Sequence, residues 1–577
     1  MSLRTPLGEP VVTPLPAPQL AREQAHAAQG LPAVQLTPHA LANLVCLATG
    51  VFAPLERFMT AADYARVLAE MRCADGTLFP LPLTLDLDER ALPKRGDRLA
   101  LRDEGNEPVA ILTLEEIFTR DPVEETKAIL GTCDPRHPFV AERSHAGTVC
   151  VSGAIDLLTL PRSPDGSEPW LTPSAARQRW AALGASRVVA FSAREPLHRG
   201  HEALLRQTAG RLDAGLLLDP GTGWPRAGDL TQFTQLRLCR TLATHCLNPE
   251  RTWLTTVPLA PRWAGPREAL WQALAYRNHG ATHFLVADHH ADPGRDRRGR
   301  PFHAAQAARE LLDQFAPETG VTAVAAPDFA YFPDEDRYVE RESTPPATTA
   351  CPLSSRALLD EYLNRDRPLP AWFVRPEAAA LLETIHPPRS RQGFCVWFTG
   401  LSGAGKSVTA RCLASLLLAH GRAVTLLDGD AVRAQLSAGL GFSRADRDAN
   451  IRRIGFVAAE IVRHQGVVIC AAVSPYRATR AEVRSRIGLD RFLEVFVDTP
   501  LAVCEARDTK GLYARARRGE LTGFTGVNDP YEPPATPELR LDTVARSVED
   551  NARAILTLLE SHGFLAHRSH TGSVQPG

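Results

Sequence analysis

The chain has 577 residues, of which 44% are hydrophobic and 23% are charged, proportions that are ordinary for globular protein. Its 65 lysine and arginine residues almost balance its 66 aspartate and glutamate residues, so the net charge argues against a nucleic-acid or membrane partner. A single hydrophobic core rarely organises so long a chain, and we therefore expect several domains.

Two sequence features favour a cytoplasmic location. No apolar run approaches the roughly 20 residues that cross a bilayer, and prolines interrupt the N-terminal stretch where a signal peptide needs a continuous apolar segment. The eleven cysteines are scattered, odd in number and free of CxxC pairs. That pattern favours reduced thiols over a disulfide framework or a zinc site.

The early part of the chain breaks short apolar runs with turns. LFPLPLTLDL (78–87) and GTVCVSGAIDLL (147–158) are examples, and they predict a mainly β domain with some helix. From about residue 170, strand-like and helical segments alternate, as in RVVAFSA (187–193) followed by EALLRQTAGRL (202–212). That alternation predicts a parallel α/β sheet. The polar, proline-bearing stretch 386–393 predicts a linker before a second α/β domain.

The second α/β domain opens with a phosphate-binding pattern. GLSGAGKS (400–407) fits GxxxxGK(S/T) and lies between a predicted strand and a predicted helix. Glycines let backbone N–H groups approach a triphosphate, and the helix N-terminus adds positive potential. Lys406 would reach the β and γ phosphates, and the Ser407 hydroxyl would ligate magnesium. The predicted ATP-binding residues are Gly400, Leu401, Ser402, Gly403, Ala404, Gly405, Lys406 and Ser407.

Further motifs follow this pattern in a fixed order. They are VTLLDGDAVR (424–433), GFSRADRDANIRRIG (441–455), AAVSPYR (471–477), FVDTPLAVCEARDTKGLY (496–513) and GFTGVNDPYEPP (523–534). With them, the region from 394 to about 562 resembles adenylylsulfate kinase (APS kinase). The resemblance implies that the γ-phosphoryl group of ATP, bound with Mg²⁺, is transferred to the 3′-hydroxyl of adenylyl sulfate, giving PAPS and ADP.

The same resemblance implies catalytic roles for particular residues. Asp430 would orient or deprotonate the 3′-hydroxyl, and Asp428 would hold magnesium through water. We expect direct in-line transfer with the Ser474 hydroxyl positioning the substrate, at a position where the family has a phosphorylated serine. Lys406 and Arg447 complete the predicted catalytic set.

The remaining predicted contacts of this domain involve adenylyl sulfate. Guanidinium and amide groups would hold its phosphosulfate and ribose, two aromatic rings would stack on adenine, and Lys510 would belong to a closing lid. The predicted substrate-binding residues are Asp430, Arg433, Phe442, Arg447, Asn450, Ser474, Arg477, Lys510 and Phe524. Ala431 stands where family members usually have asparagine, which removes one polar contact.

The upstream region contains a second ordered set of landmarks. They are TGVFAPLERFMTAADYARV (49–67), FPLPLTLDLD (79–88), GTCDPRHP (131–138), AGPREALW (264–271), THFLVAD (282–288) and FPDEDRYV (332–339). With them, the region from about 35 to 385 resembles ATP sulfurylase, which makes adenylyl sulfate from ATP and sulfate. The resemblance implies a PUA-like N-terminal domain, a nucleotidyltransferase domain and a helical tail.

This region departs from the family where sulfate should bind. The family pattern QxRNPxHxxH corresponds to FSAREPLHRGHE (191–202), in which Ser192 replaces glutamine and Glu195 replaces asparagine. Asp288 stands where the family pattern GRDHAGPG has an arginine used on sulfate. The positions that match are Arg194, His198, His201 and Arg267. The matching histidines would stabilise charge on the nucleotide phosphates, but we expect sulfate adenylyltransferase activity to be lost or impaired.

We therefore expect an α/β multidomain chain. Its predicted parts are a β-rich PUA-like domain (1–168), a Rossmann-like nucleotidyltransferase domain (169–345), a small helical subdomain with linker (346–388) and a P-loop APS kinase domain (389–577). The expected ligands are ATP, adenylyl sulfate and PAPS, and the family fusions imply a homo-oligomer.

Two alternatives remain open at this stage. A fully bifunctional enzyme would make PAPS from ATP and sulfate if Arg295, Arg297 or Arg298 replaced the missing arginine. Alternatively, the N-terminal half would be a non-catalytic platform for oligomerisation or nucleotide sensing.

Overall fold

The computed structural model describes most of the chain. The described residues are 18–87, 93–144, 146–160, 171–221, 230–255, 258–296, 298–341, 350–508, 510–521 and 523–565, without the side chains of 18–22 and Asp430. They fall into two compact units. The first contains the described residues of 1–225, 230–358 and 369–385, and the second those of 359–368 and 386–577.

The first unit begins with a mostly antiparallel five-stranded sheet, in the order β1-β3-β4-β5-β2. Its strands are β1 (Ala33–Gln35), β2 (Leu85–Leu87), β3 (Arg98–Arg102), β4 (Pro108–Thr119) and β5 (Val149–Leu157). The accompanying helices are α1 (Pro18–Ala28), α2 (Pro38–Ala48), α3 (Ala61–Glu70), α4 (Pro122–Leu130) and α5 (Pro138–Arg143). Several begin with proline, whose fixed φ and missing N–H suit the first helical position.

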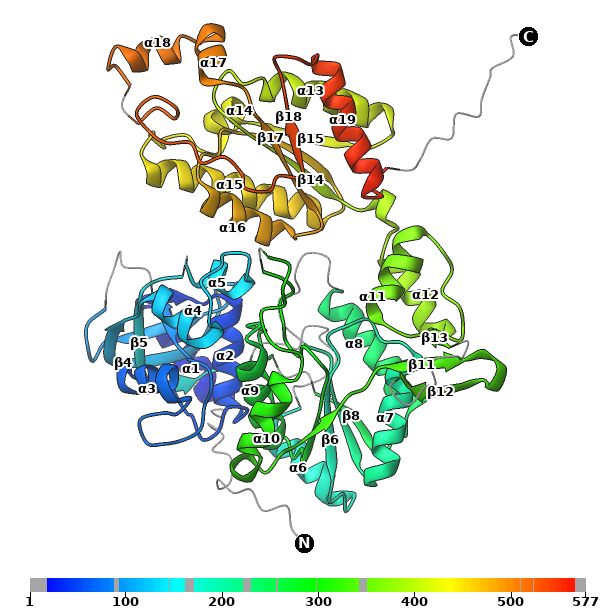
Figure 1. Cartoon of the computed structure of the whole chain (residues 1–577). Coiled ribbons are helices and arrows are strands. Elements are labelled where there is room, and N and C mark those ends of the chain that lie inside the picture. Colours follow the sequence, from blue (N-terminus) through cyan, green and yellow to red (C-terminus); the bar gives the residue numbers. More distant parts are fainter. Residues whose placement is uncertain are drawn as a thin grey trace. The chain divides into compact units, whose positions relative to one another are not determined.

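A parallel five-stranded sheet follows, in the order β10-β9-β6-β7-β8. Its strands are β6 (Val188–Ser192), β7 (Gly215–Asp219), β8 (Thr252–Leu254), β9 (His283–Val286) and β10 (Thr322–Ala325). Its helices are α6 (Pro173–Ala182), α7 (Arg199–Leu212), α8 (Gln232–Thr241) with the π-turn η1 (Leu242–Cys246), α9 (Gly265–Asn278) and α10 (Ala307–Thr319). In Figure 1, α9 and α10 lie on one side of this sheet and α7 and α8 on the other. The strand order reverses at β6, and ligands of such sheets bind beyond the carboxyl ends of the strands at that point.

The two sheets of the first unit share one hydrophobic core. Phe52 and Trp271 join them, with ring centres 5.2 Å apart. The Asn278 side chain donates hydrogen bonds to the carbonyls of Val51 and Ala53, at 2.9 and 3.0 Å. The β-rich segment is therefore packed firmly against the parallel sheet.

Smaller elements complete the first unit and lead to the second. The strands β11 (Phe329–Phe332), β12 (Arg337–Glu340) and β13 (Cys351–Pro352) form an antiparallel sheet. The short helical elements are η2 (Pro333–Glu335), α11 (Ser355–Ala357), η4 (Leu358–Tyr362), η5 (Leu363–Arg365), α12 (Pro376–Ile385) and η6 (Arg389–Arg391). Residues 359–368 belong to the second unit, where Gln392 donates a hydrogen bond to Asn364 at 2.8 Å.

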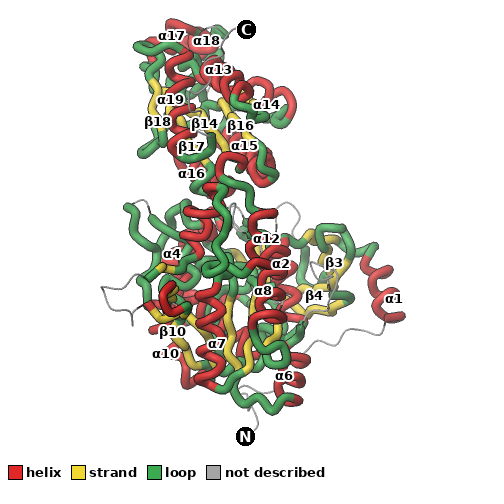
Figure 2. Tube along the Cα trace, turned by 90° about the vertical axis from the view of Figure 1, so that its right-hand side faces the viewer, coloured by secondary structure: helices red, strands yellow, loops and turns green. Residues whose placement is uncertain are grey.

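The second unit is a parallel five-stranded sheet between helices, in the order β15-β16-β14-β17-β18. Its strands are β14 (Phe394–Thr399), β15 (Val424–Asp428), β16 (Val467–Ala471), β17 (Phe492–Val497) and β18 (Leu539–Leu541). Its helices are α13 (Lys406–Ala419), α14 (Gly429–Gln435), α15 (Arg444–Arg463), α16 (Arg477–Ile487), α17 (Leu501–Arg507), α18 (Leu512–Arg517) and α19 (Val548–Ser561). One core lies under α13 and α19 and a second under α15 and α16, so helices cover both faces of the sheet (Figure 2).

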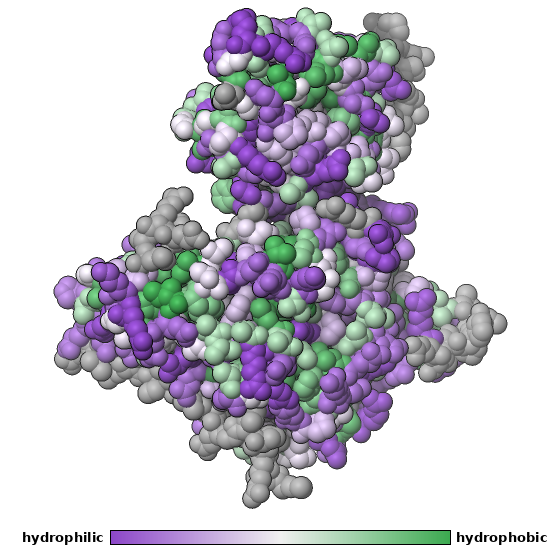
Figure 3. Space-filling view, turned by 60° about the vertical axis from the view of Figure 1, so that its left-hand side comes forward, coloured by the Kyte–Doolittle hydropathy of each residue, from purple (hydrophilic) through white to green (hydrophobic). Residues whose placement is uncertain are grey.

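The predicted fold class is confirmed: a β-rich first sheet is followed by a parallel sheet and then by a separate α/β unit. None of the helices in the described residues has both the length and the apolar composition that crossing a bilayer requires. The face of the molecule shown in Figure 3 is correspondingly rich in polar residues.

Candidate active sites

In the second unit, the glycine-rich loop joins the end of β14 to the start of α13. Gly400, Gly403 and Gly405 all have positive φ, at 149°, 73° and 106°. A Cβ at Gly400 would lie 2.6 Å from the Val497 carbonyl oxygen, so no larger residue fits there. The loop therefore brings its backbone N–H groups to the N-terminus of α13, where they can face phosphate.

Lys406 folds back over this loop. Its ammonium donates hydrogen bonds to the carbonyls of Gly400 and Leu401, at 2.9 and 2.7 Å, and the residue is only 8% exposed. The Ser407 hydroxyl donates to the Asp428 carboxylate at 3.1 Å, and that carboxylate also pairs with Arg411 at 3.2 Å. The Ser407 hydroxyl and the Asp428 carboxylate thus lie together beside the phosphate loop. Oxygen ligands of this kind, completed by water, are those that Mg²⁺ prefers.

Three hydroxyl groups hold the loop from outside. The Thr499 and Thr543 hydroxyl oxygens each lie 2.9 Å from the carbonyl oxygen of Ala404 and 2.6 Å from one another, and Tyr513 donates to the carbonyl of Ser402 at 2.9 Å. The donors come from β17, β18 and α18 or the turns beside them. The shape of the loop is therefore fixed by tertiary contacts as well as by its glycines.

An open hollow of about 630 Å³ adjoins the loop. Leu401 and residues 526–531 line it. Ligand pockets of proteins commonly measure about 300–1,000 Å³, so a nucleotide-sized ligand fits this volume.

Beside the hollow, α14, α15 and residues 523–529 bring several predicted binding residues together. Arg447 donates its Nε hydrogen to the Phe442 carbonyl at 2.9 Å and also contacts Gly523 and Thr525. Asn450 lies one turn further along α15, is 6% exposed, and its Oδ1 accepts no hydrogen bond from any described residue. The Phe442 ring is 49% exposed and has the Arg433 guanidinium 4.4 Å from its centre. This edge combines buried polar groups with one exposed aromatic face.

In the first unit, two histidines mark the carboxyl end of β6 and the start of α7. The Nδ1 of His198 accepts from the Gly200 N–H at 3.2 Å, and the Nδ1 of His201 accepts from the His198 N–H at 3.3 Å. Neutral rings with Nδ1 so occupied carry their proton on Nε2. Burial lowers the pKa of His198 well below its usual value, with a smaller effect of His201, and lowers the pKa of His201 to about 4. Both histidines are thus neutral Nε2–H donors at pH 7.

Arg194 precedes His198 by four residues and lies near two buried acidic groups. Its Nη1 donates to the fully buried Glu268 carboxylate at 2.9 Å, whereas its buried Nε and Nη2 find no partner among the described residues. The fully buried Asp219 lies opposite Ser192 in the sheet register. Burial raises the pKa of Asp219, an effect that Tyr276 and Arg194 partly oppose. Two nitrogens of the guanidinium are therefore buried without a partner, and its charge is already paired with Glu268.

Comparisons with known proteins agree with this arrangement. Three families match successive segments: a PUA-like domain at residues 4–160, ATP-sulfurylase at 167–385 and adenylylsulphate kinase at 392–542. Sulfate adenylyltransferase of Emericella nidulans is 39% identical over 559 residues, with 95% of this chain and 96% of the relative covered. The Yarrowia lipolytica enzyme of that name is 38% identical, with 93% and 95% covered.

The chain belongs to the sulfate adenylyltransferase family. It is also similar to a solved structure, the hexameric APS kinase from Thiobacillus denitrificans, with 32% identity and a TM-score of 0.62. That match covers 96% of this chain and 99% of the other. The predicted fusion of an ATP sulfurylase domain with an APS kinase domain is thereby confirmed.

Some predicted residues of the APS kinase domain do not themselves line the hollow. Phe524 is buried edge-on against Tyr513, with ring centres 5.0 Å apart. Ser474 is 2% exposed, and its hydroxyl accepts from the Trp397 indole at 3.2 Å, so it reaches a substrate only if its loop moves. Arg477 is exposed and donates to the Pro533 carbonyl at 2.5 Å. Lys510 is exposed, and the Asp430 side chain lies outside the described residues.

In the ATP sulfurylase domain, the other predicted residues either contact backbone carbonyls or lie exposed on the surface. Arg267 points to the backbone carbonyls of Val67, Leu68 and Pro80, at 3.2–3.4 Å, and does not join Arg194. Glu195 and Asp288 are exposed. The neighbouring arginines offered as replacements are exposed as well, with Arg295 donating to Gly299 and Arg298 on the surface, while Arg297 lies outside the described residues.

Sequence reasoning missed the groups that hold these sites in place. Arg480 is buried and joins Glu494 at 2.7 Å, the Ser474 carbonyl at 2.6 Å and the Glu532 carbonyl at 2.7 Å. In the sulfurylase domain, Gln272 accepts from the Nε2 of His290 at 2.7 Å and donates to Glu268 at 3.4 Å. The separations along the chain range from four residues, for Gln272 and Glu268, to 52, for Arg480 and Glu532, and no local motif indicates these contacts.

The buried histidines predict a pH dependence of stability. Between pH 6.5 and about 4 the unfolded chain takes up a proton that folded His201 does not, so the free energy of unfolding falls as pH falls through this window. His201→Asn keeps an acceptor for the His198 N–H and should remove up to about 3 kcal/mol of that loss. Thermal unfolding of the first unit at pH 7 and pH 5 measures the effect.

The exposed histidine His245 is the control for this prediction. His245→Asn should leave the pH dependence as it is in the wild type. An unchanged pH dependence in His201→Asn would show that this histidine titrates normally in the folded protein.

Proposed function

We propose that the second unit is an active APS kinase that transfers the γ-phosphoryl group of ATP to the 3′-hydroxyl of adenylyl sulfate. The observation that supports this most is that residues suited to ATP and residues suited to the acceptor lie at the same edge of the sheet. The glycine-rich loop with Lys406 supplies the ATP side, and Arg447, Asn450 and Phe442 supply an acceptor side beside the same hollow. We propose four parts of the chain: the PUA-like domain (1–168), the nucleotidyltransferase domain (169–345), the helical subdomain with linker (346–388) and the kinase domain (389–577).

In this reaction the 3′-oxygen attacks the γ-phosphorus in line with the bond to ADP. That bond breaks, ADP leaves, and the hydroxyl proton passes to the Asp430 carboxylate, which we propose as the base. Lys406 stabilises charge on the transferring oxygens. Ser407 and Asp428 would hold Mg²⁺, which neutralises the β and γ phosphates.

The acceptor assignment predicts a selective effect on substrate affinity. Asn450→Ala and Arg477→Ala should raise the KM for adenylyl sulfate by about tenfold, because each removes a hydrogen bond to a charged substrate. The KM for ATP should change little. Steady-state kinetics with each substrate varied separately measures both values.

Arg463→Ala, at the far exposed end of α15, is the matched control and should change neither constant. Equal increases in the two Michaelis constants for Asn450→Ala and Arg477→Ala would contradict their placement on the acceptor side.

For the first unit, we propose a sulfurylase domain that still receives nucleotide but handles sulfate poorly. The two histidines remain Nε2–H donors for phosphate oxygens. Against sulfate, the charge of Arg194 is partnered by Glu268, and Glu195 and Asp288 add two carboxylates to positions that are uncharged or positive in the family. The relative from Thiobacillus denitrificans, which matches over its whole length, is described as an APS kinase.

A fully bifunctional enzyme is the second candidate. The buried and unpartnered Nε and Nη2 of Arg194 favour it, because two adjacent guanidinium nitrogens can donate to two oxygens of a tetrahedral anion. Labelled sulfate with ATP separates the two proposals. Only a bifunctional enzyme makes labelled PAPS from them, whereas both make PAPS from added adenylyl sulfate.

We also propose a cytoplasmic homo-oligomer. The structure from Thiobacillus denitrificans is described as hexameric, and the scattered free cysteines suit a reducing compartment. If the first unit is mainly a platform, a chain starting at residue 359 keeps the kinase reaction but changes assembly, which light scattering measures.

A further inference from the structure

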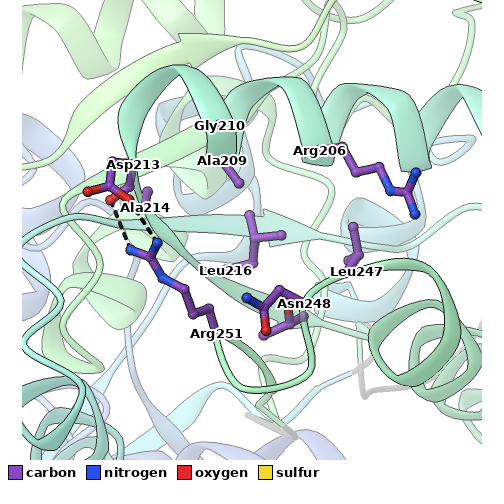
Figure 4. Close-up of a pocket in the computed structure, with 10 residues that line it drawn as sticks. Arg206, Ala209, Gly210, Asp213, Ala214, Leu216, Leu247, Asn248 and Arg251 are labelled. Atoms are coloured by element: carbon purple, nitrogen blue, oxygen red, sulfur yellow. Dashed lines mark hydrogen bonds and ion pairs between the residues drawn. The ribbon is translucent and has the colours of Figure 1, made fainter.

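A second pocket lies in the first unit, at the opposite end of the parallel sheet from His198. It forms where α7 ends and where β7 and β8 begin (Figure 4). Its volume is about 210 Å³. The lining residues are Arg206, Ala209, Gly210, Asp213, Ala214, Leu216, Leu247, Asn248, Arg251 and Thr252. None of them belongs to the nucleotide site described above.

Small residues at the end of α7 and just after it leave space in this pocket. Ala209 and Gly210 lie on α7, Ala214 follows its end, and Ala209 points toward Leu216 in Figure 4. Gly210 is exposed and a Cβ added there would meet no atom within 4 Å, so the pocket opens to solvent at this point and has room for a larger side chain. An engineered apolar cavity of about 150 Å³ binds benzene, so this pocket is large enough for a single six-membered ring.

Polar donors surround the apolar middle. The Nε of Arg206 donates a hydrogen bond to the Cys246 carbonyl at 2.7 Å and forms an ion pair with Glu202 at 3.4 Å. No described residue accepts a hydrogen bond from its Nη1 or Nη2. Asn248 accepts from the Glu250 N–H at 3.0 Å, which leaves its Nδ2 hydrogens for a ligand. Thr252 is 4% exposed, and its buried hydroxyl has no partner among the described residues.

At the opposite end of the pocket, the charge of Arg251 is already neutralised by Asp213. Arg251 pairs with Asp213 at 2.7 Å and also donates to the Asp213 carbonyl at 3.1 Å. Arg206 pairs with Glu202 only through Nε, at 3.4 Å, so it is the lining cation whose terminal nitrogens remain available. A buried hydroxyl that lacks a partner costs free energy, and a ligand that accepts or donates there removes that cost.

We propose that this pocket binds a small organic anion: one aromatic ring bearing a carboxylate. The carboxylate lies between Arg206 and the Asn248 amide, and the ring packs against Leu216 and Leu247. Donors dominate the polar lining and one cation remains available, so a carboxylate is favoured over a neutral or cationic group of equal size.

Benzoate, and benzyl alcohol as a neutral analogue of equal size, test the proposal by calorimetric titration of the full-length protein. Benzoate should bind at millimolar concentration, and at least about tenfold more tightly than benzyl alcohol. Gly210→Leu should abolish benzoate binding because leucine fills the hollow. Gly210 has ordinary helical φ and leucine is a better helix former, so the helix is kept.

Gln207→Leu, exposed on the same helix and outside the lining, is the matched control and should bind benzoate normally. Arg206→Gln should weaken benzoate by about tenfold and leave benzyl alcohol unchanged. Equal binding of the two probes, undiminished benzoate binding by Gly210→Leu, or no benzoate binding by the wild type would each overturn the proposal. A circular dichroism spectrum and a thermal unfolding transition of the first unit equal to those of the wild type confirm that Gly210→Leu is folded.

Discussion

Replacing Lys406 with alanine should lower kcat for phosphorylation of adenylyl sulfate by at least about a hundredfold. Catalysis of phosphoryl transfer rests on positioning and on charges placed against the transferring oxygens, and Lys406 is the ammonium of the phosphate loop. Its nitrogen lies on the carbonyls of Gly400 and Leu401, inside the loop and largely shielded from water. Shielding makes the charge more effective than it would be in solvent.

The loop itself should survive this substitution. Thr499, Thr543 and Tyr513 hold its carbonyls independently of the lysine. Circular dichroism and thermal unfolding close to those of the wild type would establish that. Lys127→Ala, an exposed lysine of the first unit, is the control and should turn over normally. Near wild-type turnover by a folded Lys406→Ala protein would refute the kinase assignment.

The second large effect concerns sulfate. In the Lys406→Ala background, where the kinase cannot contribute, we expect no sulfate-dependent release of pyrophosphate above background. Asp288 in place of arginine changes the local charge by two units beside a dianion. At an effective dielectric near 20, a unit pair about 4 Å apart is worth roughly 4 kcal/mol. Asp288 is exposed and solvent weakens its effect, but about 1.4 kcal/mol already costs tenfold in affinity.

Restoring the family residues gives the matching positive experiment. The triple variant Ser192→Gln, Glu195→Asn and Asp288→Arg, in the same background, should gain pyrophosphate release that depends on sulfate. Adding chloride at equal ionic strength controls for a general salt effect. Strong release at millimolar sulfate by the protein without these three changes would instead establish the bifunctional enzyme.

Local patterns predicted the phosphate loop because all the residues that bind phosphate there are consecutive in the sequence. A buried strand, glycines and a lysine followed by a helix leave few other conformations. The same holds for the alternation of strands and helices on both sides of residue 386. These features need no knowledge of distant contacts, and motif order alone was sufficient to indicate both families.

Side-chain direction was less accessible from the sequence. Arg267 and Glu268 are neighbours on α9, and successive side chains of a helix point about 100° apart. The motif singled out Arg267, but Glu268 is the residue that meets Arg194, 74 positions away in the chain. Phe524 was selected as a ring that would stack on adenine, and packing against Tyr513 buries it. Both outcomes depend on tertiary packing that a single sequence does not encode locally.

The double anchoring of the Ala404 carbonyl by Thr499 and Thr543 has a kinetic consequence. A phosphate loop that tertiary contacts hold in one shape loses little conformational entropy when a nucleotide binds. Association of ATP with this unit should then follow a single exponential, with a rate that rises linearly with ATP concentration and shows no plateau from a preceding isomerisation. Thr499→Val with Thr543→Val would free the carbonyl and introduce that plateau.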